Sequence, residues 1–342
     1  MKISEACFAR ETSPRWAAVG SNRAAYASPL LVFLFFYLFP QILPAQTTLH
    51  RYEYSHPQMG TVFRLVFYTE QDSANAAATA AHVFRRVDTL NRIFSDYLPE
   101  SELNRLSDQA GRKEPVAVSA ELADILWRAR QFSKATDGAF DVTVGALTRL
   151  WRRARNMQEM PDPVRLQSAL QTVGWRSVQF TGKQQLRLAR PGARLDLGGI
   201  AQGYAADECL RVLRTAGINR ALADAGGDIA LGDAPPGVAG WRIEIPGARP
   251  DNPEILYLAN CGITTSGATY RYLEINGIRY SHIVNPKTGL GLTHRVLVTV
   301  QASDATTADA WATAISVGGA AGWGKWKKRR YRIKVWLAES CL

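Results

Sequence analysis

The segment LDLGGIAQGY, from Leu195 to Tyr204, contains the residues of this chain that are best suited to hold an anion. Gly198 and Gly199 precede a stretch with helical spacing, so their backbone can approach a ligand closely and free amides at the helix start can face negative charge. A diglycine alone also fits a tight strand-to-helix turn. Asp196, an acid inside an apolar run directly before the glycines, favours the ligand-binding interpretation.

A second acidic segment, ADAWATA, offers two oxygen ligands on one face of a helix. Asp309 and Thr313 are four positions apart and share a helix face, while Ala308, Ala312 and Ile315 can pack inward. Two oxygen ligands suit a hard cation such as Mg²⁺, which completes its shell with phosphate and water. A solvated helix face, with a local hydrogen bond from the threonine, is the alternative interpretation.

Two further polar segments are ambiguous by themselves. In SHIVNPKTG, His282 stands beside a proline turn, where it could act as a base or donate to a ligand, although a surface histidine has the same pattern. DAGGDI has the composition of an ordinary hairpin turn, because Gly226 and Gly227 tolerate positive φ. We therefore interpret DAGGDI as structural.

The elements that must position these residues mix strand and helix patterns. Met59 to Glu70 alternates as a strand, and helices capped near Asp72 and Ser119 follow it. The later predicted elements are a helix from just after Gly199 to Gly217, strands around 221–229, 241–245, 255–258 and 296–300, a helix over 306–317, and a closing strand YRIKVWL. This order predicts a mixed α/β (α+β) fold, a single large domain with mixed sheets packed by helices.

Residues 1–45 have the layout of a secretory signal. Four cations precede the apolar run Leu30 to Phe39, and small residues ending at Ala45 follow it. A membrane anchor is the alternative, but ten apolar residues ended by a proline fall short of the ~20 that span a bilayer. We expect cleavage near Ala45, a mature domain over residues 46–342, and a periplasmic or cell-envelope location, with no lipoprotein cysteine beside the apolar run. The leader is long for such a signal, so a later translation start is a further alternative.

The net charge of +11 is concentrated in the basic C-terminal segment 325–334, which holds seven cations, so the rest of the chain is close to balanced. We predict a solvated face there and no nucleic-acid binding, because no RNA- or DNA-binding motif accompanies it. With 46% hydrophobic residues, the chain can bury a sizeable core, which excludes a fibrous or disordered protein. The cysteines after Ala45, at 209, 261 and 341, lack zinc-type spacing and do not suggest a disulfide framework.

Taken together and in order, these segments resemble the FAD:protein FMN transferase family, the ApbE-type flavin transferases. The resemblance covers nearly all of Met59 to Gly319. The matching segments are MGT at 59–61, FSDYLPESELNRLS at 94–107, DGAFDVTVGALTRLW, VGW at 173–175, LDLGGIAQGYAAD, DAGGDI, TTSGATYR, HIVNPKTG and ADAWATA.

The resemblance implies a magnesium-dependent α/β enzyme that uses FAD as its substrate. It would cleave the FAD pyrophosphate, release AMP and esterify FMN onto a threonine or serine of an exported acceptor protein. It implies a backbone-carbonyl metal ligand at Gly199 and side-chain ligands at Asp309 and Thr313, with His282 as the base for the acceptor hydroxyl. The positions matching flavin-nucleotide contacts are Met59, Ala139, Phe140, Asp141, Asp196, Gln202, Ser266 and Gly267.

The chain departs from the family pattern in two places. Gln202 stands where many relatives have lysine, which predicts weaker phosphate binding or altered specificity. After Gly319 the chain is short and very basic. In addition, SGAT at 266–269 resembles the Ser/Thr-Gly-Ala-Thr sequence that is flavinylated in acceptor proteins, so self-modification at Thr269 is a hypothesis, although a glycine turn explains the same stretch.

Two other functions stay open at this point. One is an FAD pyrophosphatase that gives FMN and AMP with water as the acceptor. The other is a non-catalytic flavin-binding protein, which the substitution at Gln202 keeps in consideration. Membrane association would come from an uncleaved signal or from the acceptor.

Overall fold

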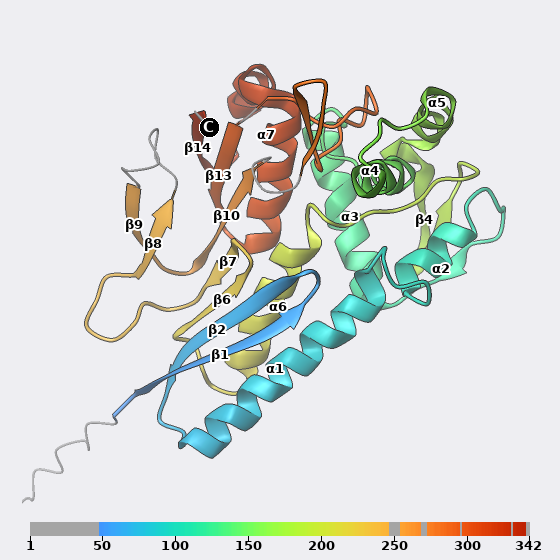
Figure 1. The fold of residues 1–342 in the computed structure, drawn as a ribbon. Helices are drawn as coiled ribbons and strands as arrows, with labels where there is room; N and C mark the ends of the chain where they lie inside the picture. The colour runs from blue at the N-terminus through green and yellow to red at the C-terminus, as the bar shows by residue number, and fades with distance from the viewer. Residues whose placement is uncertain (1–47, 246–253, 268–271, 295, 330, 340–342) are drawn as a thin grey trace, which may run out of the picture. The chain divides into compact units, whose positions relative to one another are not determined.

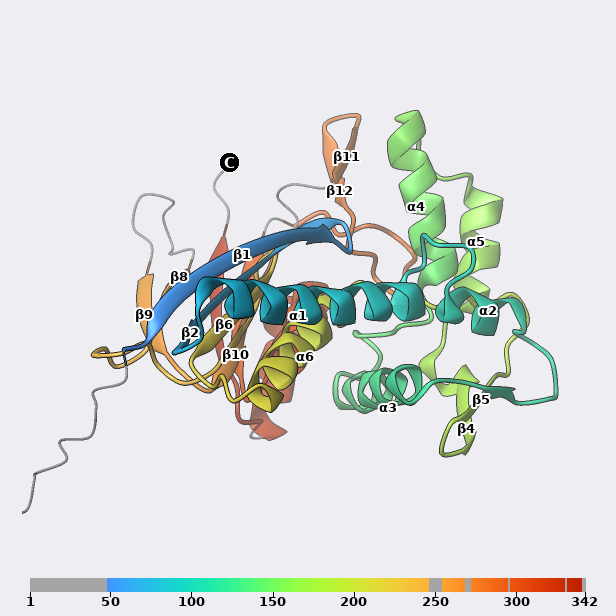
Figure 2. The same ribbon diagram turned by 90° about the horizontal axis from the view of Figure 1, so that it is seen from below.

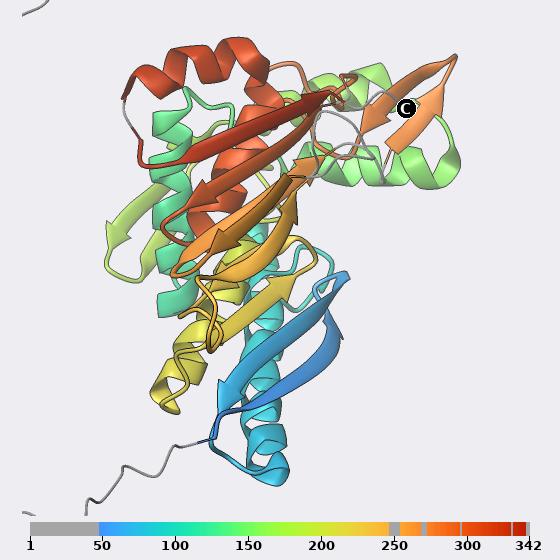
Figure 3. The same cartoon turned by 90° about the vertical axis from the view of Figure 1, so that its left-hand side faces the viewer.

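A seven-stranded antiparallel sheet is the central element of the structure. The computed structural model describes residues 48–245, 254–267, 272–294, 296–329 and 331–339. The strand order is β1-β2-β6-β7-β10-β13-β14, with each neighbouring pair antiparallel (Figure 1). These strands span His50–Gln58 (β1), Thr61–Thr69 (β2), Ala221–Ala225 (β6), Asp228–Leu231 (β7), Cys261–Gly267 (β10), Val296–Ala302 (β13) and Lys334–Glu339 (β14). Early and late parts of the chain therefore form the two edges of one sheet (Figure 3).

Helices α1 (Ser73–Phe94), α6 (Ala201–Thr215) and α7 (Ala305–Trp326) cover one face of this sheet (Figure 1). The side chains of β2 that face them alternate along the strand: Phe63 and Phe67, with Leu65 between them, are at most 1% exposed. Helix α6 packs against both α1 and α7. The expected mixture of helices and sheet is confirmed, with β1 as an additional strand before the predicted one.

The other face of the sheet is covered by a hairpin of β8 (Trp241–Ile245) and β9 (Glu254–Leu258). Alternate residues of β8, beginning with Trp241, pack with Val66 and Ile263 of the sheet. The hairpin therefore buries the middle of the second face, which explains why β2 has a buried Val66 there, whereas Val62 on the same face is 55% exposed.

A smaller group of elements, which we call the platform, has a hydrophobic cluster of its own that includes Leu147 and Trp151. Two helices and a hairpin lie side by side in it (Figure 2). The platform consists of α4 (Gly145–Met157), α5 (Pro163–Thr172), β11 (Tyr272–Ile275), β12 (Ile278–Ser281) and the loop 282–289.

Capping residues explain where three of the long helices begin. Asp72, Ser119 and Asp304 each accept a hydrogen bond from the backbone amide three residues later, at the start of α1, α3 and α7. The predicted starts near Asp72 and Ser119 are confirmed.

The other elements are α2 (Glu102–Asp108), α3 (Ala120–Ala135), the 3-10 turns η1 (Trp175–Ser177) and η2 (Lys327–Arg329), and a small sheet of β3 (Val116–Ala117), β5 (Gln185–Leu188) and β4 (Val178–Gly182).

The last helix runs beyond its predicted end because it bends and then continues. At Gly319 the backbone has φ 61° and ψ −169°, a left-handed conformation that glycine adopts without steric cost. The bend returns Trp326 onto Trp311, with ring centroids 6.2 Å apart. The predicted closing strand is present as β14.

The basic segment 325–334 is more than a solvated face. Lys325 pairs with Asp137 at 2.9 Å, and Arg329 donates to the carbonyl of Ala135 at 2.6 Å. Ala135 ends α3, where the helix dipole favours cations. Two cations of the segment therefore hold the end of α7 and the turn after it against the end of α3.

Two predictions fall outside the described residues: the signal at residues 1–45 and self-modification at Thr269. Within the described ranges, no helix combines the length and the apolar character needed to cross a bilayer.

Candidate nucleotide and metal site

Gly199 lies where α6 begins, in direct contact with α7. The amide of Gly198 donates to the Asp196 carboxylate at 2.7 Å, so this carboxylate shapes the turn before the helix. A Cβ atom on Gly199 would lie 2.8 Å from Oγ1 and 2.9 Å from Cγ2 of Thr313. Only a glycine lets Thr313 approach the backbone so closely. The structure thus brings together two of the three predicted metal ligands.

Asp309 lies one helical turn before Thr313 and completes the predicted ligand set. Its carboxylate accepts from the amide of Gly203 at 3.2 Å, and the residue is 5% exposed. A Cβ atom on Gly203 would collide with the carbonyl of Ala305, so this glycine also permits the close approach. Helices α6 and α7 therefore cross at two glycines, and the predicted ligands lie at the crossing.

The electrostatics around Asp309 favour a bound cation. Burial raises the pKa of Asp309 well above its ordinary value, and the negative charges of Asp228 and Asp207 raise it further. A buried carboxylate is costly unless a cation or metal compensates it. Among the ion pairs that the described residues form, none involves Asp309 or Asp228.

The donors at this crossing fit magnesium. A backbone carbonyl, a carboxylate and a hydroxyl are hard oxygen ligands, and Mg²⁺ takes few of these from a protein while keeping positions for phosphate and water. In the part of the chain that the structure describes, no group of three or more His, Cys, Asp or Glu side chains forms a metal site of another kind. The two described cysteines, Cys209 and Cys261, are free thiols.

Asp228 is a buried acid that sequence reasoning missed, because DAGGDI looked like an ordinary turn. It begins β7 and is 7% exposed. Burial raises the pKa of Asp228 to about 7, and the charge of Asp224 contributes. An acid that follows a diglycine and opens a buried strand is the signal that could have identified it.

The turn between β1 and β2 reaches the start of α6. Met59 and Gly60 form this turn with φ of 54° and 74°. The side-chain amide of Gln202 donates to the carbonyl of Met59 at 3.3 Å. Thr61 packs on Gly226 so closely that a Cβ atom there would collide with its hydroxyl. Two predicted nucleotide contacts, Met59 and Gln202, are therefore neighbours, and the Gln202 amide is engaged with the protein.

The segment from Ala139 to Asp141 is buried next to the turn that contains Asp196. The backbone amide of Asp196 donates to the carbonyl of Val142, the residue after this segment, at 2.8 Å. The Asp141 carboxylate accepts from the amide and hydroxyl of Thr143, at 2.9 and 2.6 Å, and from the amide of Trp175 at 2.9 Å. These bonds hold the VGW segment in place. The contact of Asp141 with a nucleotide stays a prediction.

Ser266 and Gly267 lie at the end of β10, beside α7. The hydroxyl of Ser316 donates to that of Ser266 at 3.3 Å. Ser316 follows Thr313 by three positions, so it lies near Thr313 on the same side of the helix. The structure thus places the predicted nucleotide contact Ser266 near the α7 part of the candidate site.

His282 lies on the platform, exposed on the turn after β12. Its loop is anchored to α4, because the indole nitrogen of Trp151 donates to the carbonyl of Gly289 at 2.7 Å. The Trp151 and Tyr280 rings also pack, with centroids 5.3 Å apart. Helix α4 therefore anchors the loop that carries the candidate base.

Asp96, Tyr97 and Arg152 form a group of charged and aromatic residues beside Asp196 that the sequence patterns did not predict. Burial and the charge of Asp196 raise the pKa of Asp96, which pairs with Arg152 at 2.7 Å. The Arg152 guanidinium lies 3.6 Å from the ring centroid of Tyr97, which is 64% exposed. An exposed aromatic ring at this position offers a flat surface for a planar ligand. Local sequence carries no signal for an ion pair that joins residues so far apart in the chain.

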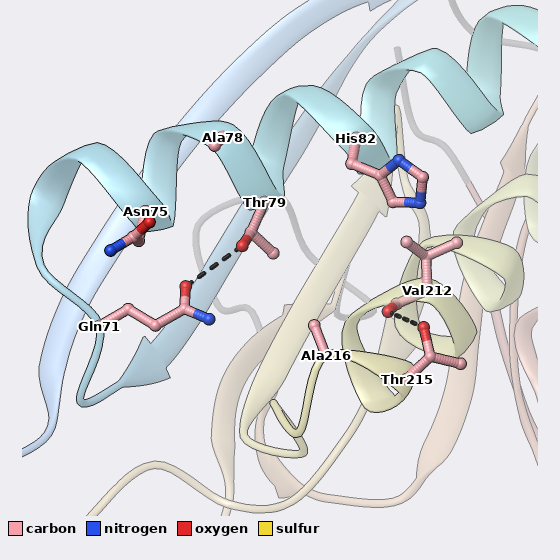
Figure 4. Close-up of a pocket in the computed structure, with 8 residues that line it drawn as sticks. All are labelled: Gln71, Asn75, Ala78, Thr79, His82, Val212, Thr215 and Ala216. Atoms are coloured by element: carbon pink, nitrogen blue, oxygen red, sulfur yellow. Dashed lines mark hydrogen bonds between the residues drawn. The ribbon is translucent and has the colours of Figure 1, made fainter.

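A groove between α1 and α6 lies away from these residues. It has a volume of about 590 Å³, and its lining includes Gln71, Thr79, His82 and Thr215 (Figure 4). Thr215 ends α6, fourteen positions or about 21 Å from Ala201 at the helix start. The groove is therefore separate from the candidate site.

Comparison with known proteins identifies the family of the sequence. The chain matches the ApbE family over residues 59–337. It is 33% identical over 287 residues to the FAD:protein FMN transferase of Treponema pallidum, a match that covers 78% of this chain and 79% of that protein. It is 31% identical over 262 residues to the FAD:protein FMN transferase of Escherichia coli K12, covering 72% of this chain and 73% of that protein.

Solved structures agree with the sequence comparison. The flavin transferase ApbE from Vibrio cholerae has a TM-score of 0.75 and 28% identity, with 85% of this chain and 94% of that chain covered. The apo form of the Pseudomonas stutzeri flavinyl transferase ApbE has a TM-score of 0.77 and 25% identity, with 85% and 92% covered. Since the family match extends over most of the sequence, the chain belongs to the ApbE family.

Proposed function

We propose that this chain is a magnesium-dependent transferase that moves FMN from FAD to a threonine or serine of an exported acceptor protein and releases AMP. The observation that carries the proposal is the meeting of Gly199, Thr313 and the buried Asp309 where α6 begins. The FAD:protein FMN transferases that share about a third of its residues support the same activity.

Mg²⁺ would be held by the carbonyl of Gly199 and the side chains of Asp309 and Thr313. When bound, it supplies positive charge that neutralises the pyrophosphate oxygens as the phosphorus is attacked. The nearby charge of Asp228 adds to the negative potential that attracts the cation, as the raised pKa of Asp309 indicates.

FAD would bind across the start of α6. The residue before this helix, Ile200, makes no side-chain cap, and the amide of Gly203 in the first turn donates to the Asp309 carboxylate, so a pyrophosphate would meet the positive end of the helix dipole. Met59 and Gln202 border this helix start. The exposed ring of Tyr97 offers a face on which the flavin can stack.

The transfer requires the acceptor hydroxyl to attack the phosphorus on the FMN side of the pyrophosphate. A bond forms between the acceptor oxygen and this phosphorus, the bond to the bridging oxygen breaks, and AMP leaves with that oxygen. His282 takes the hydroxyl proton, and its exposed position makes it accessible to a protein acceptor.

The proposal is tested by incubating the full chain with FAD, Mg²⁺ and an exported protein domain that carries a Ser/Thr-Gly-Ala-Thr sequence. Covalent flavin fluorescence of that domain in a denaturing gel supports transfer. Free FMN and AMP without labelling would instead assign a pyrophosphatase, and unchanged FAD would assign a flavin-binding protein.

The metal assignment is tested by Asp309→Asn, with Asp304→Asn as the matched control on the same helix. Asp304 caps the start of α7 and pairs with Arg128. It precedes the predicted ligands Asp309 and Thr313 along the helix. Asp309→Asn should abolish labelling and Mg²⁺ binding in calorimetry, whereas Asp304→Asn should keep both. Labelling by Asp309→Asn at the wild-type rate would refute the assignment.

We propose that the protein is exported, on the basis of the signal pattern in residues 1–45. Fractionation of expressing cells, with the intact mass of the recovered protein, tests this proposal. The same mass tests self-modification at Thr269, because one esterified FMN would add the mass of FMN less that of one water molecule.

A further inference from the structure

The outer end of the platform carries exposed apolar side chains close together in the chain. Met157 ends α4, Val164 lies in the first turn of α5, and Met160 lies between them. Their exposed fractions are 54%, 74% and 40% in that order. Single exposed apolar residues are ordinary, but a group of them marks an interaction surface.

Unpaired cations flank these apolar residues. Arg153 on α4 and Arg165 on α5 are exposed, and neither forms an ion pair with a described residue. We refer to Arg153, Met157, Met160, Val164 and Arg165 as the tip. Glu159 and Asp162 are exposed in the same segment, but the three arginines at 153, 155 and 165 outnumber them. Apolar anchors with a surplus of cations around them complement a protein surface that is apolar at its centre and acidic around it.

The tip is continuous with residues of the candidate site. Met157 lies five positions, or about 7.5 Å, along α4 from Arg152, which pairs with Asp96 beside Asp196. The same helix holds the loop of His282, through the bond from Trp151 described above. Helix α4 and the β11–β12 hairpin share one hydrophobic cluster and lie side by side (Figure 2).

We propose that the tip is the docking site of the acceptor protein, which binds it with an acidic surface that includes apolar side chains. Helix α4 connects the tip to the loop of His282, so a partner docked at the tip would extend along the platform to bring its hydroxyl to that histidine. The proposal rests on the proposed transferase function and names the surface that selects the protein substrate.

The first test compares two pairs of serine substitutions in the full chain. Met157→Ser with Val164→Ser changes the tip, and Val238→Ser with Ile255→Ser is the control, because these residues are 52% and 45% exposed outside the platform. The substrates are a folded acceptor domain and a short peptide with the same Ser/Thr-Gly-Ala-Thr sequence. The tip pair should raise KM for the folded domain roughly tenfold, since loss of interface anchors weakens binding by about that factor. It should leave kcat and the rate with the peptide unchanged.

The second test reverses charge. Arg153→Glu with Arg165→Glu should raise KM for the folded domain and weaken its dependence on salt, because exposed charges act mainly on encounter. The control reverses the exposed cations Arg112 and Lys183 in the same way. Unchanged KM in both tip variants, or an equal rise in the controls, overturns the docking site and leaves the transferase standing. A wild-type enzyme that labels neither the domain nor the peptide overturns both proposals.

Discussion

Replacing Gly199 by alanine tests the site where α6 and α7 meet. The new methyl group would lie 2.8 Å from Oγ1, 2.9 Å from Cγ2 and 3.2 Å from Cβ of Thr313. Ordinary contacts between such atoms are about 3.5–4.0 Å, so Thr313 or the helix must move by several tenths of an ångström. The change therefore displaces two of the three predicted Mg²⁺ ligands without removing either one.

Overpacking of this kind costs about 1–3 kcal/mol, which corresponds to about a five- to 150-fold change in an equilibrium constant. Part of this cost should appear in the free energy of unfolding and the rest in weaker Mg²⁺ binding. Gly324→Ala is the matched control, because a Cβ atom there meets nothing within 4 Å and the backbone φ is not positive. We expect the control to leave Mg²⁺ binding unchanged and to raise the free energy of unfolding by at most about 1 kcal/mol, because Gly324 lies within α7 and alanine is the better helix former.

Urea unfolding and calorimetric titration with Mg²⁺ measure the two quantities. A double-mutant cycle with Thr313→Ala separates the clash from a general effect of the substitution. Because Thr313→Ala removes both of the closest atoms, Gly199→Ala should cost much less in that background than in the wild type. Equal costs in the two backgrounds would refute the contact, and wild-type Mg²⁺ affinity in Gly199→Ala would refute the role of this crossing in metal binding.

Three further predictions concern the surroundings of the crossing. Without divalent cations, the free energy of unfolding should fall as the pH rises from about 4 to about 7, because burial raises the pKa of Asp228 from 3.8 to about 7 and the folded state holds its proton more tightly; the slope from urea unfolding should be shallower in Asp228→Asn, where the raised pKa of Asp309 still contributes in the same direction. Trp151→Phe should lose about 1–2 kcal/mol of unfolding free energy, because it leaves the Gly289 carbonyl without its 2.7 Å donor, and hydrogen exchange should increase in the His282 loop. Gln202→Lys should lower the Kd for FAD at low salt, measured by flavin fluorescence, and the effect should vanish at high salt.

The ligand types could be predicted from the sequence because each has a local pattern. A diglycine before a helix identifies Gly199, and four-residue spacing identifies Asp309 and Thr313. Their meeting could not be predicted in the same way. It depends on how closely α6 and α7 pack, and this distance is set by the contact of Gly203 with the Ala305 carbonyl, which joins segments far apart in the chain.

The two platform helices differ in whether the local sequence marks their start. Helix α4 follows Val144, which provides no side-chain cap, so its start has no sequence signal. Helix α5 begins with the cap Asp162 and has Pro163 in its first turn, a pattern that would have predicted it. The ion pair of Asp96 with Arg152 has no local pattern, because it depends on how α4 packs against the segment after α1.

The helix crossing also explains which positions of the site can vary. Gly199 and Gly203 each meet atoms of α7 that leave no room for a side chain, so core packing and metal binding restrict the same positions. Gln202 lies between them in the chain, but its side chain reaches outward to the carbonyl of Met59. A different side chain at 202 therefore changes how the nucleotide is held while the crossing keeps its spacing. Substrate preference can thus diverge at the edge of the site without altering the oxygen ligands beneath it.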